Sequence, residues 1–421
     1  MSQHLGAPYA PYPPPSPPPS PPPRPRRRGR WIALGAVVAS LMLTGGVVVA
    51  VVPGADRFLP EFGQPKGTPA SSPSDSSSPS DSSPPSDSAS PTVTSDANPT
   101  PASPTVGGWY AGASGLGVAS GKFQRWLGQP VTVAATWADQ DDAAQRTLPA
   151  LKGEYKNWDG ALDLAVGGTV LGSHENYAKA ARGAYDKRWR AAAKTLADRR
   201  KNATGPTFVR PFHEMNGDWY DNWTVTKANS ADFKKAFARY VGILRAAMPN
   251  VYISWSPNWS DHTDLPVAFW YPGDSVVDCV APDYYDDGTS PARVNIAAWN
   301  AESTDKDSTG NPVGLEAWRQ LALAHGKPLC FPEWGLKPAG AGVDHPVWIQ
   351  AVNAWMNKFA NAATWTLGEP IPAEAAGKVL YSVYFNVEHG GDPRFTIYGT
   401  RANPKSSAAY RKLTWGKPAA G

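Results

Sequence analysis

The sequence predicts an α/β fold, a (β/α)8 barrel (TIM barrel), preceded by a disordered tail, one transmembrane helix and a disordered linker. Two observations predict the barrel. Eight short apolar runs lie beyond residue 105 of the 421-residue chain, and most lack polar alternation, as expected of strands buried on both faces. Amphipathic helical patterns separate several of these runs. Residues 106–421 are therefore expected to form one large domain.

The N-terminal region contains a long segment without charge. The 22 residues 31–52, WIALGAVVASLMLTGGVVVAVV, include no charged side chain. At about 1.5 Å per residue, a helix of this length measures roughly 33 Å, enough to cross the apolar core of a bilayer. The basic stretch RPRRRGR directly before it predicts a cytoplasmic N-terminus and an external C-terminal domain. A cleaved signal peptide is the alternative, and it would also export the domain.

The segments on either side of this run cannot bury a core. Residues 1–30 are rich in proline and are expected to form a disordered cytoplasmic tail. Residues 53–105, mostly Ser, Pro, Asp and Thr in their second part, are expected to form a linker that holds the domain away from the membrane. The net charge is +4, but tail arginines supply five positive charges, so the remainder is near neutral and no nucleic-acid partner is indicated.

The predicted strands and helices occur in the order that a barrel requires. The strands are GGWYAG (107–112), VTVAAT (131–136), ALDLAV (161–166), TFVRPF (207–212), VYISWS (251–256), VVDCVA (276–281), PLCFPE (328–333) and LYSVYF (380–385). The clearest helices are 176–200, 230–248 with Ser230 as its N-cap, and 315–326. An open doubly wound sheet is the alternative, but AGASGLG (111–117) lacks the Gly-x-Gly-x-x-Gly order usual after its first strand.

Side chains suited to chemistry occur at the predicted strand ends, where barrels place their catalytic residues. The fourth strand ends at His213 and Glu214, and the seventh ends at Glu333. Two carboxyls across the barrel mouth favour glycoside hydrolysis, with one as acid/base and one as nucleophile. Burial among Trp and Tyr would keep Glu214 protonated near neutral pH, whereas a hydrogen bond from Tyr285 would keep Glu333 ionised.

Other polar and sulfur-containing residues have simpler interpretations. His213 is the only histidine at the ends of the fourth to eighth predicted strands, so no metal site is indicated. Asp139 follows the second strand and is expected to be solvated. Cys279 and Cys330 are the only cysteines, and in an exported domain they form either a disulfide or two buried thiols.

Five stretches of the domain carry a resemblance to a known family. They are ARGAYDKRW (181–189), FVRPFHEMNGDWY (208–220), ISWSPN (253–258), YPGDSVVDCVAPDYYD (271–286) and KPLCFPEWG (327–335). Spread over residues 106–415, the match resembles glycoside hydrolase family 26, which belongs to a clan of retaining (β/α)8 glycosidases. The His-Glu pair of FVRPFHEMNGDWY is the most distinctive part, because Asn precedes the acid/base in most of the clan.

The resemblance implies roles for particular residues. Glu214 would be the acid/base and Glu333 the nucleophile, with His213 and Tyr285 as supporting residues. The resemblance and the strand ends together give these candidates for substrate binding: Trp219, Trp255, Asp283, Trp334, Tyr384 and Phe385. The eighth strand departs from the family, because YFNVEHGGDPRF (384–395) lacks the Trp expected nearby.

The expected function follows from this resemblance. It is that of an extracellular, membrane-tethered retaining endo-β-glycanase, a mannan endo-1,4-β-mannosidase, because β-1,4-mannan is the most frequent substrate in the family. Mixed-linkage β-glucan and β-1,3-xylan are alternative substrates. A non-catalytic glycan-binding wall protein is the alternative from another class. A monomer without a cofactor is expected, with the polysaccharide and the membrane as its partners.

Overall fold

A computed structural model of the chain describes residues 103–139, 141–220, 222–286, 291–337, 344–389, 391–399 and 401–418. The predicted tail (1–30), the transmembrane helix (31–52) and nearly all of the linker lie outside the described residues. Among the described residues, no helix combines the length and the apolar character needed to span a bilayer.

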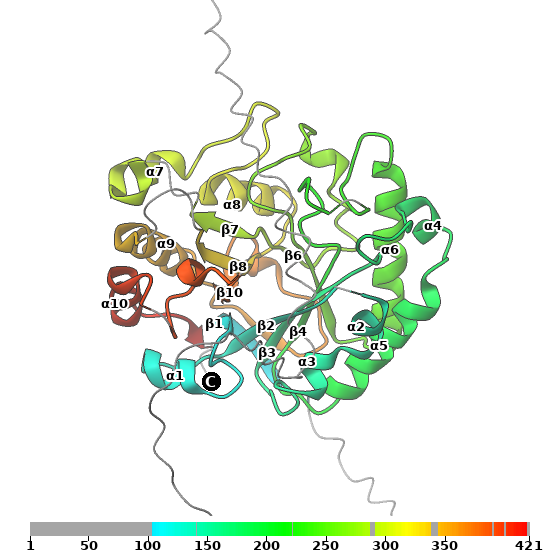
Figure 1. The fold of residues 1–421 in the computed structure, drawn as a ribbon, viewed down its shortest axis with the longest axis horizontal. Helices are drawn as coiled ribbons and strands as arrows, with labels where there is room; N and C mark the ends of the chain where they lie inside the picture. The colour runs from blue at the N-terminus through cyan, green and yellow to red at the C-terminus, as the bar shows by residue number, and fades with distance from the viewer. Residues whose placement is uncertain are drawn as a thin grey trace, which may run out of the picture.

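Eight strand positions close into a parallel barrel, as predicted. The barrel strands are β1 (Thr105–Gly115), β2 (Val133–Ala138), β3 (Ala161–Val166), β4 (Thr207–Pro211), β5 (Val251–Trp255), β6 (Cys279–Val280) with β7 (Tyr284–Asp286), β8 (Leu329–Leu336) and β10 (Val379–Asn386). Each strand pairs in parallel with its neighbour, and β10 pairs with both β8 and β1. This closure excludes the open-sheet alternative (Figure 1).

The sixth strand position is the least regular part of the barrel. It consists of β6 and β7, which both pair with β8 and are separated by a short break. Pro282 lies in this break and has no backbone N–H to donate to a neighbouring strand. The single strand predicted at 276–281 therefore starts later and continues, after the break, to Asp286.

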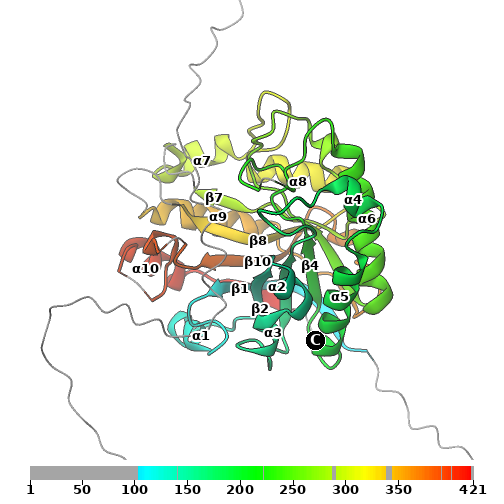
Figure 2. The same ribbon diagram turned by 45° about the vertical axis from the view of Figure 1, so that its right-hand side comes forward.

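Helices surround the barrel (Figures 1 and 2). They are α1 (Lys122–Leu127), α2 (Asp142–Thr147), α3 (Pro149–Lys152), α4 (Tyr177–Ala181), α5 (Asp186–Arg200), α6 (Ser230–Ala247), α7 (Ile296–Glu302), α8 (Leu315–Ala324), α9 (Pro346–Lys358) and α10 (Pro404–Lys412). Short 3-10 turns occur at Val267–Phe269, Pro291–Arg293, Ala373–Ala375 and Pro393–Phe395, and the small strands β9 (Thr364–Thr366) and β11 (Lys417–Pro418) pair antiparallel with β1.

Two of the predicted helices differ in detail from the structure. The helix predicted over 176–200 is divided into α4 and α5, and Gly183 lies between them with φ of 89°, a conformation that favours glycine. The N-cap of α6 is Asn229, whereas Ser230 is the first helical residue and donates its hydroxyl to the carbonyl of Phe269 at 2.5 Å. A tertiary contact therefore uses the side chain that the sequence assigned to capping.

The core has two layers, one outside the strands and one inside the barrel. The outer layer joins strands to helices, and in it the Trp189 ring of α5 stacks on the Tyr240 ring of α6 with centroids 4.5 Å apart. The inner layer includes Phe208, Tyr381 and both cysteines. Cys279 of β6 and Cys330 of β8 form a disulfide with Cα atoms 6.1 Å apart, so of the two alternatives left by the sequence the disulfide is present.

Candidate active site

Glu214 lies just beyond β4, at the C-terminal end of the barrel strands, which we call the mouth. Phe212 and Glu214 have φ angles of 52° and 51°, which non-glycine residues seldom adopt. Packing and a hydrogen bond hold this conformation. The Phe212 ring is fully buried, and the backbone N–H of Glu214 donates to the carbonyl of Ser256 at 2.6 Å. The chain thus bends sharply after β4 and aims the Glu214 side chain at the mouth.

Two hydrogen bonds fix the Glu214 carboxyl group. Asn258 Nδ2 donates to Oε1 at 2.8 Å, and Trp219 Nε1 donates to Oε2 at 2.9 Å. Asn258 is itself held by Asn216, which accepts from its backbone N–H at 2.8 Å and donates to its carbonyl at 3.0 Å. A Cβ atom at Gly217 would lie 2.5 Å from the Trp219 ring, so glycine at this position lets the indole fold back onto the acid.

Glu333 lies within β8, and three donors hold its carboxylate. Oε1 accepts from a terminal guanidinium nitrogen of Arg210 and from Trp137 Nε1, both at 2.8 Å, and Oε2 accepts from the Tyr285 hydroxyl at 2.9 Å. These donors come from β4, β2 and β7. Arg210 also donates from Nε to Asp163 of β3 at 2.6 Å, so its position is set from the barrel interior.

The two carboxyl groups have opposite protonation preferences. Burial, and then the negative charge of Glu333, raise the pKa of Glu214 to about 7. Burial would also raise the pKa of Glu333, but the positive charge of Arg210 and the hydrogen bonds from Arg210 and Trp137 hold that pKa below its usual value. Near neutral pH, Glu214 can therefore carry a proton while Glu333 is ionised, which is the division that an acid and a nucleophile require.

His213 is buried beside Glu214. Its Nε2 lies 3.0 Å from the Tyr220 hydroxyl and 3.5 Å from a carboxylate oxygen of Asp139. Burial and the charge of Arg210 lower the pKa of His213 to about 3, so the ring is neutral at physiological pH. Asp139 is only 4% exposed, and the expectation that it is solvated is wrong. Burial raises the pKa of Asp139 to about 7.

The substrate-binding candidates occupy three different environments. Trp219 is partly exposed at the rim of the mouth, beside Glu214. Phe385 is 8% exposed and packs edge-on against Trp137 and Tyr285, the two neutral donors to Glu333. Asp283 is fully buried below the mouth, where both carboxylate oxygens lie 3.2 Å from the Ser256 hydroxyl.

The other three candidates are not brought to the mouth. Trp255, Trp334 and Tyr384 are fully buried in the outer layer of the core and have no face open to a sugar. Successive side chains of a strand point to opposite faces, so Glu333 and Trp334 cannot both line the mouth. The sequence at a strand end does not show which of two successive side chains faces the mouth, because strands buried on both faces lack polar alternation.

Three residues that hold the carboxyls were not assigned from the sequence, namely Arg210, Trp137 and Asn258. For Arg210 a signal exists. It stands inside an apolar strand, three positions before His213, and a charge buried there must have a partner. For Trp137 and Asn258 the only signal is their place at the end of a predicted strand, which many structural residues share.

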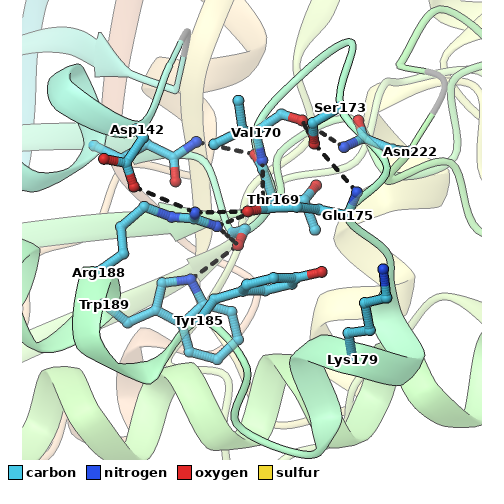
Figure 3. Close-up of polar contacts among 12 residues, drawn as sticks. Asp142, Thr169, Val170, Ser173, Glu175, Lys179, Tyr185, Arg188, Trp189 and Asn222 are labelled. Carbon is cyan, nitrogen blue, oxygen red and sulfur yellow. Dashed lines mark hydrogen bonds and ion pairs between the residues drawn. The ribbon is translucent and has the colours of Figure 1, made fainter.

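Loops around the mouth are tied to one another by buried and partly buried polar groups (Figure 3). Arg188 of α5 donates to the Glu175 carboxylate at 2.8 and 2.6 Å and to the carbonyl of Gly168 at 3.0 Å. Asn222 Nδ2 donates to the carbonyl of Val170 at 2.6 Å and so joins the loop after β4 to the loop after β3. These contacts fix the wall of the mouth on the β3 side. No group of three or more His, Cys, Asp or Glu suited to a metal ion occurs among the residues described.

Comparisons with known proteins agree with this geometry. Residues 178–303 match the sequence profile of Glycosyl hydrolase family 26. A mannan endo-1,4-beta-mannosidase of Bifidobacterium adolescentis is 34% identical over 116 residues, which are 26% of this chain and 11% of that protein. A mannan endo-1,4-beta-mannosidase of Bacillus subtilis is 25% identical over 189 residues, 42% of this chain and 45% of that protein. The chain thus spans less than half the length of these two relatives.

A modular endo-beta-1,4-mannanase from Cellulomonas fimi has a solved structure that is similar to this chain. It is 17% identical, with a TM-score of 0.46, over 74% of this chain and 75% of that chain. The matched segment 178–303 contains Glu214 with its His213 neighbour, and Tyr285, which holds Glu333. Over residues 178–303 the chain is thus similar to glycosyl hydrolase family 26.

Proposed function

We propose that the chain is a retaining endo-β-glycanase that hydrolyses β-1,4-mannan by double displacement. One observation carries this proposal, the contrast between a protonatable Glu214 and an ionised Glu333 at the same mouth. Two carboxyls of unlike pKa are what glycoside hydrolysis requires. The names of the two relatives described above, both mannan endo-1,4-beta-mannosidases, support mannan as the substrate.

In the first step, a Glu333 oxygen attacks the anomeric carbon, and the bond from that carbon to the leaving sugar oxygen breaks. The electron pair of this bond stays on the oxygen, which takes the proton of Glu214. Arg210, Trp137 and Tyr285 hold Glu333 in place for the attack. The products are the reducing-end fragment, whose leaving oxygen is now a hydroxyl group, and a covalent glycosyl-enzyme.

In the second step, water attacks the anomeric carbon of the glycosyl-enzyme. The Glu214 carboxylate takes a proton from this water, and Glu333 leaves as a carboxylate. Two inversions at one carbon restore the original configuration. NMR of a β-linked oligosaccharide should show the β-anomer of the product first, and early appearance of the α-anomer would overturn the double displacement.

The substrate is tested with a panel of neutral polysaccharides. The purified chain is incubated with β-1,4-mannan, mixed-linkage β-glucan and β-1,3-xylan, and reducing ends and product lengths are measured. Release of mixed short oligosaccharides from mannan, at a higher rate than from the other two, is expected of an endo-mannanase. Binding to a glycan without release of reducing ends would instead assign the chain to glycan-binding proteins.

The proposed location follows from the N-terminal sequence. Residues 31–52 anchor the chain, and the linker presents the catalytic domain as a monomer outside the cell. The domain should then be cleaved by protease added to intact cells, and the full chain should sediment with membranes. A soluble chain in the medium that begins beyond residue 52 would overturn the anchor and identify a cleaved signal peptide.

A further inference from the structure

Lys337 is the first residue beyond β8, four positions after Glu333. Its side chain is exposed, and among the described residues it has no hydrogen bond or ion pair. Exposed lysines are common, so exposure alone assigns no role. The position of Lys337 relative to the strand that carries Glu333 is more informative.

The alternation of side chains along β8 places Lys337 on the side of the mouth. Glu333 points to the mouth, where Tyr285 binds it, whereas Trp334 and Leu336 are buried in the outer layer of the core. Gly335 pairs with Tyr285 and has no side chain. Position 337 therefore shares the face of Glu333, and no side chain stands between the two residues on that face.

The charge of Lys337 affects three titratable groups around the mouth. Burial raises the pKa of Glu214, after β4, and the charge of Lys337 opposes this rise. Burial lowers the pKa of His262, after β5, and of His389, after β10, and the charge of Lys337 contributes to lowering both. These groups lie beyond β4, β5 and β10, which agrees with the place of Lys337 on the face of β8 that carries Glu333.

We propose that Lys337 binds the substrate, by donating hydrogen bonds to hydroxyl oxygens of the sugars on either side of the bond that is cleaved. This inference rests on the proposed function. The ammonium has three N–H donors and no partner among the described residues, and a sugar presents hydroxyl acceptors to any donor that faces it. A hydrogen bond from a charged donor is stronger than one between neutral groups.

The same ammonium has a second effect on the reaction. Its positive charge favours the ionised form of Glu214, which must accept a proton from water in the second step. Lys337 is thus expected to influence both substrate affinity and the pH range in which Glu214 works. A lysine with only a structural role would influence neither.

The test compares Lys337→Met and Lys337→Arg with a control, Lys201→Met. Lys201 is an exposed lysine at the C-terminal end of α5, on the opposite end of the barrel from the mouth.

For Lys337→Met on neutral mannan, we expect KM to rise about tenfold or more, the usual effect of losing a charged donor. The alkaline limb of kcat/KM should move to higher pH, because the pKa of Glu214 rises without the nearby charge. Lys337→Arg should retain most affinity, and Lys201→Met should match the unsubstituted chain.

Binding is measured separately, in a Glu333→Gln background that cannot turn substrate over. Calorimetry with a mannan oligosaccharide should show a weaker affinity when Lys337→Met is added, with an unchanged melting temperature. If Lys337→Met leaves the substrate affinity and the pH of the alkaline limb of the active enzyme unchanged, the role of Lys337 is overturned and the proposed function stands. If the unsubstituted chain hydrolyses no glycan of the panel, the proposed function itself fails.

Discussion

Arg210 joins the carboxylates of Glu333 and Asp163, at 2.8 Å and 2.6 Å respectively. Asp163 in turn accepts from the Tyr381 hydroxyl at 2.6 Å, and that hydroxyl lies 3.0 Å from the Ser254 hydroxyl. The guanidinium is fully buried, and its charge is the largest effect that lowers the pKa of Glu333. The interior of the barrel therefore sets the ionisation of a residue at its mouth.

Arg210→Gln should move the acidic limb of kcat/KM to higher pH. The nucleophile must be ionised, its pKa rises when the positive charge is removed, and activity is lost as the pH falls through that higher pKa. We expect kcat/KM to fall by about 10²-fold or more at the pH optimum. The free energy of unfolding should fall by about 3–5 kcal/mol, because buried carboxylates lose their counterion.

The matched control is Arg239→Gln, which removes an arginine paired with Asp186 at the partly exposed outer surface. Its pH profile should equal that of the unsubstituted enzyme. If Arg210→Gln also keeps the original acidic limb, Arg210 does not set the ionisation of Glu333.

Trp219→Phe tests the indole that binds Glu214. The substitution keeps an aromatic ring but removes the N–H donor to Oε2, which opposes the burial that raises the pKa of Glu214. The enzyme should lose activity as the pH rises through about 7, the pKa of Glu214, and in Trp219→Phe this alkaline limb should lie at higher pH. We expect kcat/KM to fall about five- to tenfold, the usual effect of one neutral hydrogen bond.

Trp158→Phe is the control for that substitution. Trp158 lies in the loop before β3, and its indole N–H donates to the carbonyl of Ala161, the first residue of that strand, at the end away from the mouth. An alkaline limb that shifts equally in both variants would mean that the loss of the Trp219 donor does not act through Glu214.

Glu214→Ala and Glu333→Ala should fail at different steps. On polysaccharide, Glu214→Ala should lose activity by roughly 10²–10⁴-fold, the usual contribution of general catalysis. On an aryl glycoside with a good leaving group, it should release a burst of aryl alcohol and then slow, because no base activates water. Azide should rescue the slow phase and give the β-glycosyl azide.

Glu333→Ala should give no burst, because the covalent intermediate cannot form. A burst from Glu333→Ala and none from Glu214→Ala would show that the two roles are reversed. Full turnover in both variants would place the reaction at another site.

Removal of the disulfide should lower the stability of the barrel. The bond closes a loop with a sequence separation of 51, for which the chain-entropy relation gives about 4 kcal/mol. Denaturant unfolding of the Cys279→Ala/Cys330→Ala variant should show a decrease of about 2–5 kcal/mol in the free energy of unfolding. The unsubstituted chain should show a similar loss in reductant, and an equal stability in all three cases would contradict the prediction.

The sequence predicts the order of the barrel strands because parallel strands buried on both faces are continuous apolar runs. It also places Glu214 and Glu333 at the ends of two of them, since a carboxyl after such a run is conspicuous. The same continuity hides which residues face inward. Trp334 and Tyr384 were expected at the mouth for this reason, and they lie in the outer layer of the core.

Contacts between residues far apart in the sequence could not be predicted from local patterns. Arg210 and Asp163 are 47 residues apart, and Trp137 and Glu333 are 196 residues apart. Arg210 and Asp163 meet because β4 and β3 are neighbours in the sheet, whereas Trp137 of β2 and Glu333 of β8 meet only because the barrel closes. The cysteines of β6 and β8 are another case, because their pairing depends on β6 being the neighbour of β8 rather than on any local spacing.

The glycine at position 217 has a consequence for mutational scanning. A scan that replaces each residue by alanine detects a residue through the side-chain atoms that are removed. At a glycine the same replacement adds a methyl group instead. The added methyl group would meet the Trp219 ring at 2.5 Å and push the indole away from Glu214. Gly217→Ala should therefore lower activity in the way that a substitution of Glu214 does. A scan that omits glycines would miss this residue, which helps to position Glu214.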